Sequence, residues 1–241
     1  MKLQLVRHAT LLLDYAGMKI LVDPMLSDAG AMSAIQNSPR PRPNPLVPLP
    51  FPIEQVLEGV QLVLVTHTHR DHWDDAAIQL VPKDLPLLCQ PEDMKKMEAV
   101  HFVNASPVHD MKHWSHICIT RTPAQHGSGE IARAMAPSSG YVLSTAGEPT
   151  LYITGDTIWY DQVAETIKQI QSAGYCGECR RGAVSARRSH YHDGRRHHPC
   201  LSRRAACSGS RSPHGSHQSL FADTERTGAA CGERRGASDG S

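Results

Sequence analysis

The chain has 241 residues, of which 40% are hydrophobic, and its formal net charge is +1. No apolar run is long enough to cross a bilayer, and Arg7 and His8 interrupt the N-terminal apolar run too early for a signal peptide. We therefore expect a soluble, cytoplasmic protein, and its seven cysteines, an odd number, argue against a disulfide framework.

The charge is divided unevenly along the chain. Residues 1–172 carry 13 basic and 18 acidic side chains, a net charge of −5, whereas residues 173–241 carry 12 basic and 6 acidic ones, a net charge of +6. The second part has one valine and no isoleucine, so it lacks the residues that form ordinary core strands. We predict a folded domain over residues 1–172 and a poorly ordered tail, rich in Arg, His, Cys and Gly, over residues 173–241.

The elements of the domain follow from short apolar runs and turn residues. The first strands are predicted over residues 2–6, 11–15 and 18–22. The next 28 residues, 25–52, are rich in Pro, Ser and Asn, which favours a long surface loop of the kind that often serves as a functional lid. Helices and strands then alternate, with helices over residues 53–59, 75–80 and 91–100 and strands over residues 62–65 and 87–89. Later strands are predicted over residues 116–122, 141–144 and 150–154, before a helix over residues 161–171.

The densest group of metal-ligating residues follows the apolar run of residues 60–65. Three imidazoles and a carboxylate lie within six residues: His67, His69, Asp71 and His72. His67 and His69 are two residues apart, so an extended backbone points both side chains the same way, while the other two lie on the turn into the next helix. Four such groups at a strand end would be costly without a ligand, and their spacing suits two neighbouring metal ions.

Two more polar residues follow predicted strands. His126 comes after the strand over residues 116–122, and Asp156 comes directly after Thr154-Gly155 at the end of the strand over residues 150–154. Catalytic groups gather at such strand ends, which makes both candidates for the same site. For Asp23, a turn-forming role before Pro24 and a role in orienting a metal ligand are left open.

These motifs resemble the metallo-β-lactamase superfamily. The resemblance is carried by T-H-T-H-R-D-H, by a lone His before Gly and by T-G-D after an apolar strand. The runs R-H-A-T-L-L-L, L-V-D-P-M-L-S and Q-H-G-S-G-E are similar to a bacterial subgroup related to L-ascorbate-6-phosphate lactonase. The resemblance covers residues 1 to about 172 and implies an α/β fold, an αββα sandwich of two mixed sheets flanked by helices.

The resemblance also implies a role for each ligand. One metal ion is assigned to His67, His69 and His126. A second ion is assigned to Asp71 and His72, with Asp156 bridging the two ions. Imidazole and carboxylate suit divalent ions, with Zn²⁺ as the first choice and Mn²⁺ or Fe²⁺ as alternatives. The implied activity is hydrolysis of a small ester, lactone or phosphoester by metal-bound hydroxide, with Asp71 as the catalytic residue that orients the hydroxide or relays its proton. No nucleic-acid or membrane partner is expected, and homo-oligomerisation is left open.

The tail departs from the family pattern, which implies one more metal-binding histidine after a late apolar strand. His214 and His217 have no such strand before them, so neither is assigned as a ligand. If the reading frame is shifted by one base, residues 210–220 can encode V-A-V-H-M-E-A-I-N-H-C, and residues 173–184 and 190–203 can encode a strand and a helix of the expected kinds. We hypothesise a one-base insertion or deletion near Ser172, which would leave a frameshift-inactivated or non-catalytic metal-binding protein as the alternative to an active enzyme.

Two other interpretations of the tail are less favoured. Its Arg-Arg pairs are of the kind that binds nucleic-acid phosphates, and Cys176, Cys179 and Cys200 with nearby histidines have the residue types of a zinc knuckle. Neither interpretation is supported by an apolar framework or by interleaved aromatic residues.

Overall fold

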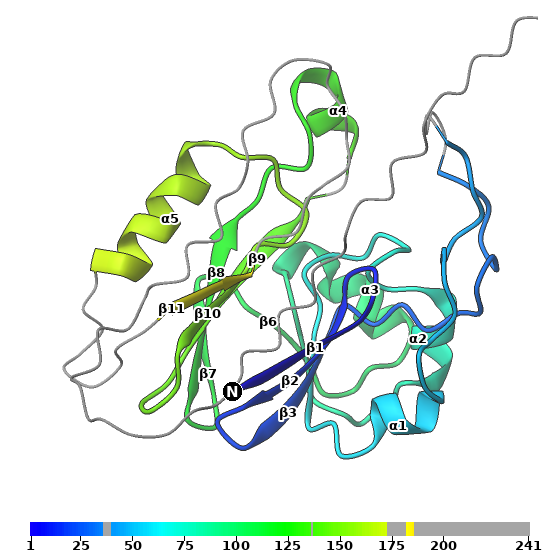
Figure 1. Cartoon of the computed structure of the whole chain (residues 1–241), viewed down its shortest axis with the longest axis horizontal. Helices are drawn as coiled ribbons and strands as arrows, with labels where there is room; N and C mark the ends of the chain where they lie inside the picture. The colour runs from blue at the N-terminus through cyan, green and yellow to red at the C-terminus, as the bar shows by residue number, and fades with distance from the viewer. Residues whose placement is uncertain (36–39, 136, 173–181, 186–241) are drawn as a thin grey trace, which may run out of the picture. The chain divides into compact units, whose positions relative to one another are not determined.

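The computed structural model describes residues 1–35, 40–135, 137–172 and 182–185. All of them belong to the first of two compact units, Met1–Ser202 and Arg203–Ser241. They form two β-sheets with flanking helices (Figure 1). His214, His217 and the segments of the predicted frame shift beyond Ser185 lie outside the described residues. Among the helices in the described ranges, none has the length and hydropathy needed to cross a membrane.

The first sheet has six strands in the order β1-β2-β3-β4-β5-β6. Its strands are β1 (Lys2–Arg7), β2 (Thr10–Tyr15), β3 (Met18–Val22), β4 (Leu62–Leu64), β5 (Leu87–Cys89) and β6 (Ala105–Pro107). The first three strands pair antiparallel, whereas β3 to β6 pair parallel, so the sheet is mixed as predicted. Because β3, β4 and β5 run parallel, their carboxyl ends meet at one edge of the sheet, where ligand sites form in such sheets.

The second sheet has five strands in the order β11-β10-β9-β8-β7. Its strands are β7 (Met111–Trp114), β8 (Ile117–Pro123), β9 (Ser139–Ser144), β10 (Thr150–Ile153) and β11 (Gly182–Ser185). The strands from β7 to β10 pair antiparallel, and β11 pairs parallel with β10. β11 lies at the start of the tail and forms the edge of this sheet, where it pairs with β10. The strand contains the tail's single valine, Val184, and its pairing uses backbone groups that every residue except proline offers in full.

Helices lie on the outer face of each sheet and in the connections between strands. They are α1 (Ile53–Leu57), α2 (Asp75–Leu80), the 3₁₀ helix η1 (Pro91–Asp93), α3 (Met94–Ala99), α4 (Gly129–Ala134) and α5 (Asp161–Ser172). α1, α2 and α3 lie along the first sheet, and α5 lies along the second (Figure 1). The order helix, sheet, sheet, helix confirms the predicted αββα sandwich.

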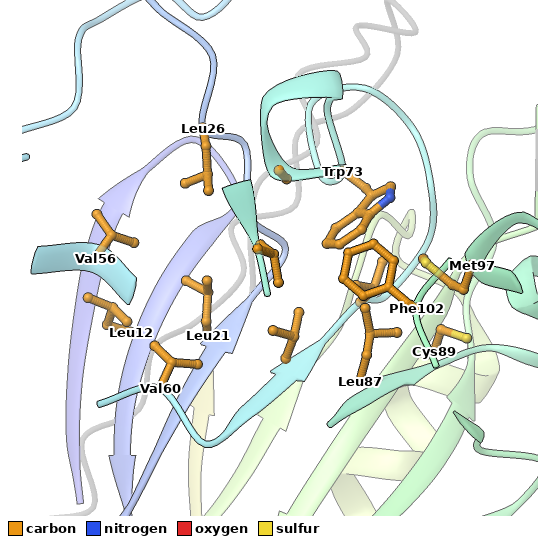
Figure 2. Close-up of a cluster of buried hydrophobic side chains, with 14 of the residues drawn as sticks. Leu12, Leu21, Leu26, Val56, Val60, Trp73, Leu87, Cys89, Met97 and Phe102 are labelled. Atoms are coloured by element: carbon orange, nitrogen blue, oxygen red, sulfur yellow. The ribbon is translucent and has the colours of Figure 1, made fainter. Parts of the chain in front are cut away.

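Three apolar clusters hold these layers together. On the outer face of the first sheet, Leu12 and Leu21 pack near Val56 of α1, and the Trp73 and Phe102 rings meet edge to face with centroids 5.3 Å apart (Figure 2). Between the sheets, residues such as Ile20 and Leu64 pack against residues such as Ile119 and Tyr141. Under α5, Val163 packs on Val142 and Tyr152. Apolar burial on both faces of both sheets is what the near-continuous apolar strands require.

The long loop between β3 and α1 is anchored to the first sheet. Its described residues contain one isolated bridge, Met32 to Asn44, and no helix or longer strand. The buried guanidinium of Arg7 donates to the backbone oxygens of Met25 (2.8 Å from Nη2), Val47 (3.0 Å from Nη1) and Ser27. The loop was predicted from its composition, but its attachment through Arg7 depends on contacts over 18 to 40 residues.

Candidate metal centre

Four of the six predicted ligands lie in the short irregular segment that follows β4. Its start is fixed by Asp23, which follows β3 and whose two carboxylate oxygens accept hydrogen bonds from the Thr66 backbone N (2.7 Å) and from Thr66 Oγ1 (2.8 Å). Its end is a turn in which the backbone N atoms of His72 and Trp73 donate to His69 O. Asp74 then caps α2 by accepting from Ala77 N at 2.8 Å. The histidines therefore lie between two fixed points.

His67 is fully buried at the centre of the cluster. Its Nδ1 lies 3.1 Å from Thr66 Oγ1, and because the Thr66 hydroxyl already donates to Asp23, that oxygen accepts a hydrogen bond from Nδ1 of His67. The proton is thereby placed on Nδ1, and Nε2 keeps its lone pair. Nε2 lies 3.1 Å from Nδ1 of His69, so two imidazole nitrogens converge on one point.

His72 is oriented by the same carboxylate. Its Nδ1 lies 2.9 Å from Oδ2 of Asp23, while its Nε2 lies 3.2 Å from Oδ1 of Asp156 and 3.7 Å from Oδ2 of Asp71. Nε2 is buried and has no aligned hydrogen-bond partner among the residues that the structure describes. Asp23, for which two roles were left open, thus holds both Thr66 and His72 in place, and its backbone also adopts a positive φ of 45°.

The second sheet contributes the other two donors. His126 follows β8 and Asp156 follows β10, and Nε2 of His126 lies 3.4 Å from Oδ2 of Asp156. Their loops are joined because the backbone N of Ile158 donates to Gln125 O at 2.8 Å. Gly155 has a φ of +60°, and a Cβ there would lie 2.4 Å from Ser139 O, so only glycine lets this loop present Asp156.

The donors form two overlapping groups, each with its ligand atoms within 4.8 Å of one another. The first group is His67, His69 and His126; the second is His67, His72 and Asp156. The first is the trio assigned to one ion from the sequence. The second group contains His67 besides His72 and Asp156, and Asp71 lies next to it, with Oδ2 3.7 Å from Nε2 of His72 and 36% of its side chain exposed. The structure brings five of the six predicted ligands together and leaves Asp71 beside them.

The cluster fits a divalent transition metal on the evidence of its own atoms. Its donors are imidazole nitrogens and a carboxylate, the set that Zn²⁺ and similar ions prefer. Among the described residues, His72 Nε2 and His126 Nδ1 are buried without a hydrogen-bond partner. Buried polar atoms of this kind are rare unless something else satisfies them, and His72 Nε2 faces the carboxylate of Asp156 within the cluster.

The charges of the cluster also favour a cation. Burial, together with the smaller effect of the neighbouring His72, lowers the pKa of His67 to about 2. Burial lowers the pKa of His69 as well. Burial would also lower the pKa of His72, but the carboxylates of Asp23 and Asp156 outweigh it and raise that pKa to about 10. Without metal, positive charge is thus held on the ring that faces two carboxylates.

These shifts predict how the stability of the metal-free protein depends on pH. For His67 and His69 the folded pKa lies below the unfolded value of about 6.5, so stability is lost as the pH falls below that value. For His72 the folded pKa lies above the unfolded value, so its contribution is present below about pH 6.5 and is lost as the pH rises toward 10. We expect urea unfolding of chelator-treated protein to show greater stability near pH 6.5 than at pH ~5 or ~9. A His72→Gln variant should lack the alkaline decline, and an unchanged decline in that variant would contradict the assignment.

Comparison with known families agrees with the fold. A family model described as a beta-lactamase superfamily domain matches residues 18–192. The UPF0173 protein YddR of Bacillus subtilis is 37% identical over 170 residues, which cover 69% of this chain and 67% of that protein. A UPF0173 metal-dependent hydrolase of Azorhizobium caulinodans is 25% identical over 174 residues, 68% of this chain and 66% of that protein. The chain spans about two thirds of the length of these relatives.

Two solved structures are similar to this one over most of the described residues. An isothiocyanate hydrolase from Delia radicum gut bacteria is 39% identical, with a TM-score of 0.67, and the match covers 71% of this chain and 69% of that one. A possible metal-dependent hydrolase from Veillonella parvula is 29% identical, with a TM-score of 0.68, over 70% of this chain and 68% of that one.

Proposed function

The chain belongs to the metallo-β-lactamase superfamily of metal-dependent hydrolases, and we propose that it hydrolyses a small electrophilic substrate at the cluster around His67. The observation that carries the proposal is the convergence of five donor side chains from three loops that are far apart in the sequence. Buried imidazoles and a carboxylate in this arrangement can bind a metal ion. Without a ligand, burying so many polar groups together would cost free energy.

The proposed roles follow from the position of each side chain. A divalent ion held by His67, His69 and His126, with a second near His72 and Asp156, would supply Lewis-acid chemistry and make hydroxide available near neutral pH. Asp23 keeps the His72 ring turned toward Asp156. Asp71 lies partly exposed at the rim of the cluster, and we assign it the task of orienting the attacking water and taking up its proton.

The substrate class proposed first is an isothiocyanate. The support is the 39% identical structure of an isothiocyanate hydrolase, which covers most of the described fold. An isothiocyanate has an electrophilic carbon between nitrogen and sulfur. Addition of one water to that carbon forms a C–O bond and places one of the two water protons on nitrogen, which gives a thiocarbamic acid. The C–N bond then breaks as the remaining hydroxyl proton moves to nitrogen, and the products are the amine and carbonyl sulfide. The esters, lactones and phosphoesters expected from the sequence are the alternative substrates.

A panel of substrates separates these alternatives. Purified protein loaded with Zn²⁺, Mn²⁺ or Fe²⁺ would be incubated with benzyl isothiocyanate, a p-nitrophenyl ester, a γ-lactone and a phosphodiester, and product formation would be measured directly. We expect benzylamine to appear fastest, and chelator treatment to abolish the reaction. Metal-dependent turnover of the ester, lactone or phosphodiester alone would replace the isothiocyanate assignment, and loss of turnover in Asp71→Asn with retained metal would support the proton-transfer role.

The frame shift near Ser172 remains a second proposal about this chain. It is supported by the change in charge and composition after residue 172 and by the strand and helix sequences that a one-base shift restores. A protein so altered would bind metal at His67, His69 and His126 but lack part of the second site. Sequencing the coding DNA tests the idea, and so does comparing metal content and turnover with those of a frame-restored version. Equal values in the two proteins would refute it.

A further inference from the structure

The segment between His67 and His69 is held from the side of β5 as well as from the side of β3. On one side, Asp23 after β3 binds Thr66. On the other side, Oδ1 of Asp93, in η1 after β5, accepts a hydrogen bond of 2.7 Å from Thr68 Oγ1. Since β3 and β5 flank β4 in the sheet, each neighbouring strand supplies one carboxylate to a threonine beside His67. The two threonines bracket that histidine.

Three hydrogen-bond donors hold the carboxylate of Asp93 in position. Its side chain is only 3% exposed, and besides Thr68 it accepts hydrogen bonds from Lys96 Nζ (2.8 Å) and from Gln90 Nε2 (2.7 Å). Lys96 also donates to Thr68 Oγ1, so the threonine hydroxyl is used as both donor and acceptor. A buried carboxylate costs free energy unless it is fully hydrogen-bonded, and here each bond locates the carboxylate more firmly.

Gln90 connects this anchor to the second sheet. Its Nε2 donates to Pro137 O (2.7 Å) as well as to Asp93, and its Oε1 accepts from Ser139 Oγ (2.8 Å). Because Nε2 faces two acceptors and Oε1 faces a hydroxyl, the orientation of the amide is determined. The backbone N of Ser139 in turn lies 3.3 Å from Thr66 O. The anchor therefore spans both sheets beside the cluster.

We propose that Asp93 is a positioning residue of the metal centre, which acts through Thr68 to fix the separation and direction of His67 and His69. This proposal rests on the metal-binding role proposed above. Among the described residues, Thr68, which lies between the two histidines, donates its hydroxyl to Asp93 and accepts from Lys96, and Lys96 is itself paired with Asp93. The His69 ring contacts the rings of His67 and His126, and among the described residues no carboxylate is hydrogen-bonded to it as Asp23 is to His72.

The test measures zinc affinity rather than turnover. Wild-type protein, Thr68→Val, Thr68→Ser, Asp93→Asn and the double variant Thr68→Val/Asp93→Asn would compete with a chromophoric chelator for Zn²⁺. We expect Thr68→Val and Asp93→Asn each to weaken binding about tenfold or more, the range typical of removing a group that orients ligands. Thr68→Ser keeps the hydroxyl and should bind within about twofold of wild type. The double variant should bind zinc no more than about twofold worse than the single variant with the lower affinity, because both changes break the same Thr68–Asp93 hydrogen bond.

Two controls separate positioning from general stability. Thr166→Val removes a threonine hydroxyl on α5 that donates to Gln162 O at 2.8 Å and leaves the Thr68–Asp93 bond, so its zinc affinity should stay near that of wild type. Urea unfolding of each metal-free variant reports loss of fold independently of zinc. Wild-type affinity in Thr68→Val, or losses that add in the double variant, would overturn the positioning role. If wild-type protein binds no zinc, the metal centre itself fails and the positioning role fails with it.

Discussion

Replacing His67 with alanine is expected to reduce hydrolysis by more than 100-fold and to remove the tightly bound metal. His67 is the one residue present in both ligand groups, so its loss leaves His69 and His126 in one and His72 and Asp156 in the other. Loss of a residue that only orients a ligand typically costs about 10–100-fold in metal affinity or activity, and loss of a ligand itself should exceed that range. Metal content by atomic emission and turnover on the best substrate of the panel would be measured together.

A matched control makes this result specific to the site. His113 lies exposed on β7, away from both ligand groups, so His113→Ala removes an imidazole without touching the cluster. Its metal content and turnover should match those of wild type. If His67→Ala retained full metal content and turnover within a few-fold of wild type, the cluster would not be the catalytic centre.

The fold could be predicted where local sequence signals coincide with the hydrophobic pattern. The helix over residues 75–80 and the strand over residues 87–89 have the predicted bounds, since Asp74 caps the first and Pro86 precedes the second. β6, β7 and α4 were missed. β6 contains three residues and ends in Pro107, and β7, Met111–Trp114, has a charged and a polar residue in four and no fully buried position. Such strands are stabilised by pairing with a neighbour rather than by their own composition.

The metal-ligating residues of the candidate site could be predicted from the sequence, but the residues that position them could not. His67, His69 and His72 form one local motif, and each of the others follows a strand. The placement of Asp71 at the rim depends on the turn closed by His69 O, which spacing alone does not determine. Asp93 gives no sequence signal, because it lies 25 residues from Thr68 and resembles any acidic residue in a first helical turn. Pairings over that distance are set by the parallel strand order, which periodicity does not reveal.

Replacing Arg7 with methionine should cause the largest loss of stability outside the apolar core. Arg7 is 3% exposed, and its guanidinium satisfies the backbone oxygens of Met25, Ser27 and Val47. Methionine fills similar volume but leaves these carbonyls without a donor, at roughly 1–3 kcal/mol for each that stays buried. We expect the free energy of unfolding to fall by about 3–5 kcal/mol, which corresponds to roughly 6–20 °C in Tm for a chain of this size.

Arg7→Met should also affect the metal centre, because the loop that Arg7 anchors contacts the segment that carries His72. The backbone N of Ser27 donates to Oδ2 of Asp74 at 2.7 Å, and Asp74 also caps the helix that follows His72. Arg7→Lys keeps the charge but not the planar fork, so it should recover less than half of the lost stability. Arg70→Met is the matched control, because Arg70 is exposed in a surface ion pair with Asp75, and its loss should cost about 1 kcal/mol or less. Equal Tm values for Arg7→Met and Arg70→Met would show that the loop is not held by Arg7, since only the buried guanidinium leaves backbone acceptors unsatisfied when it is removed.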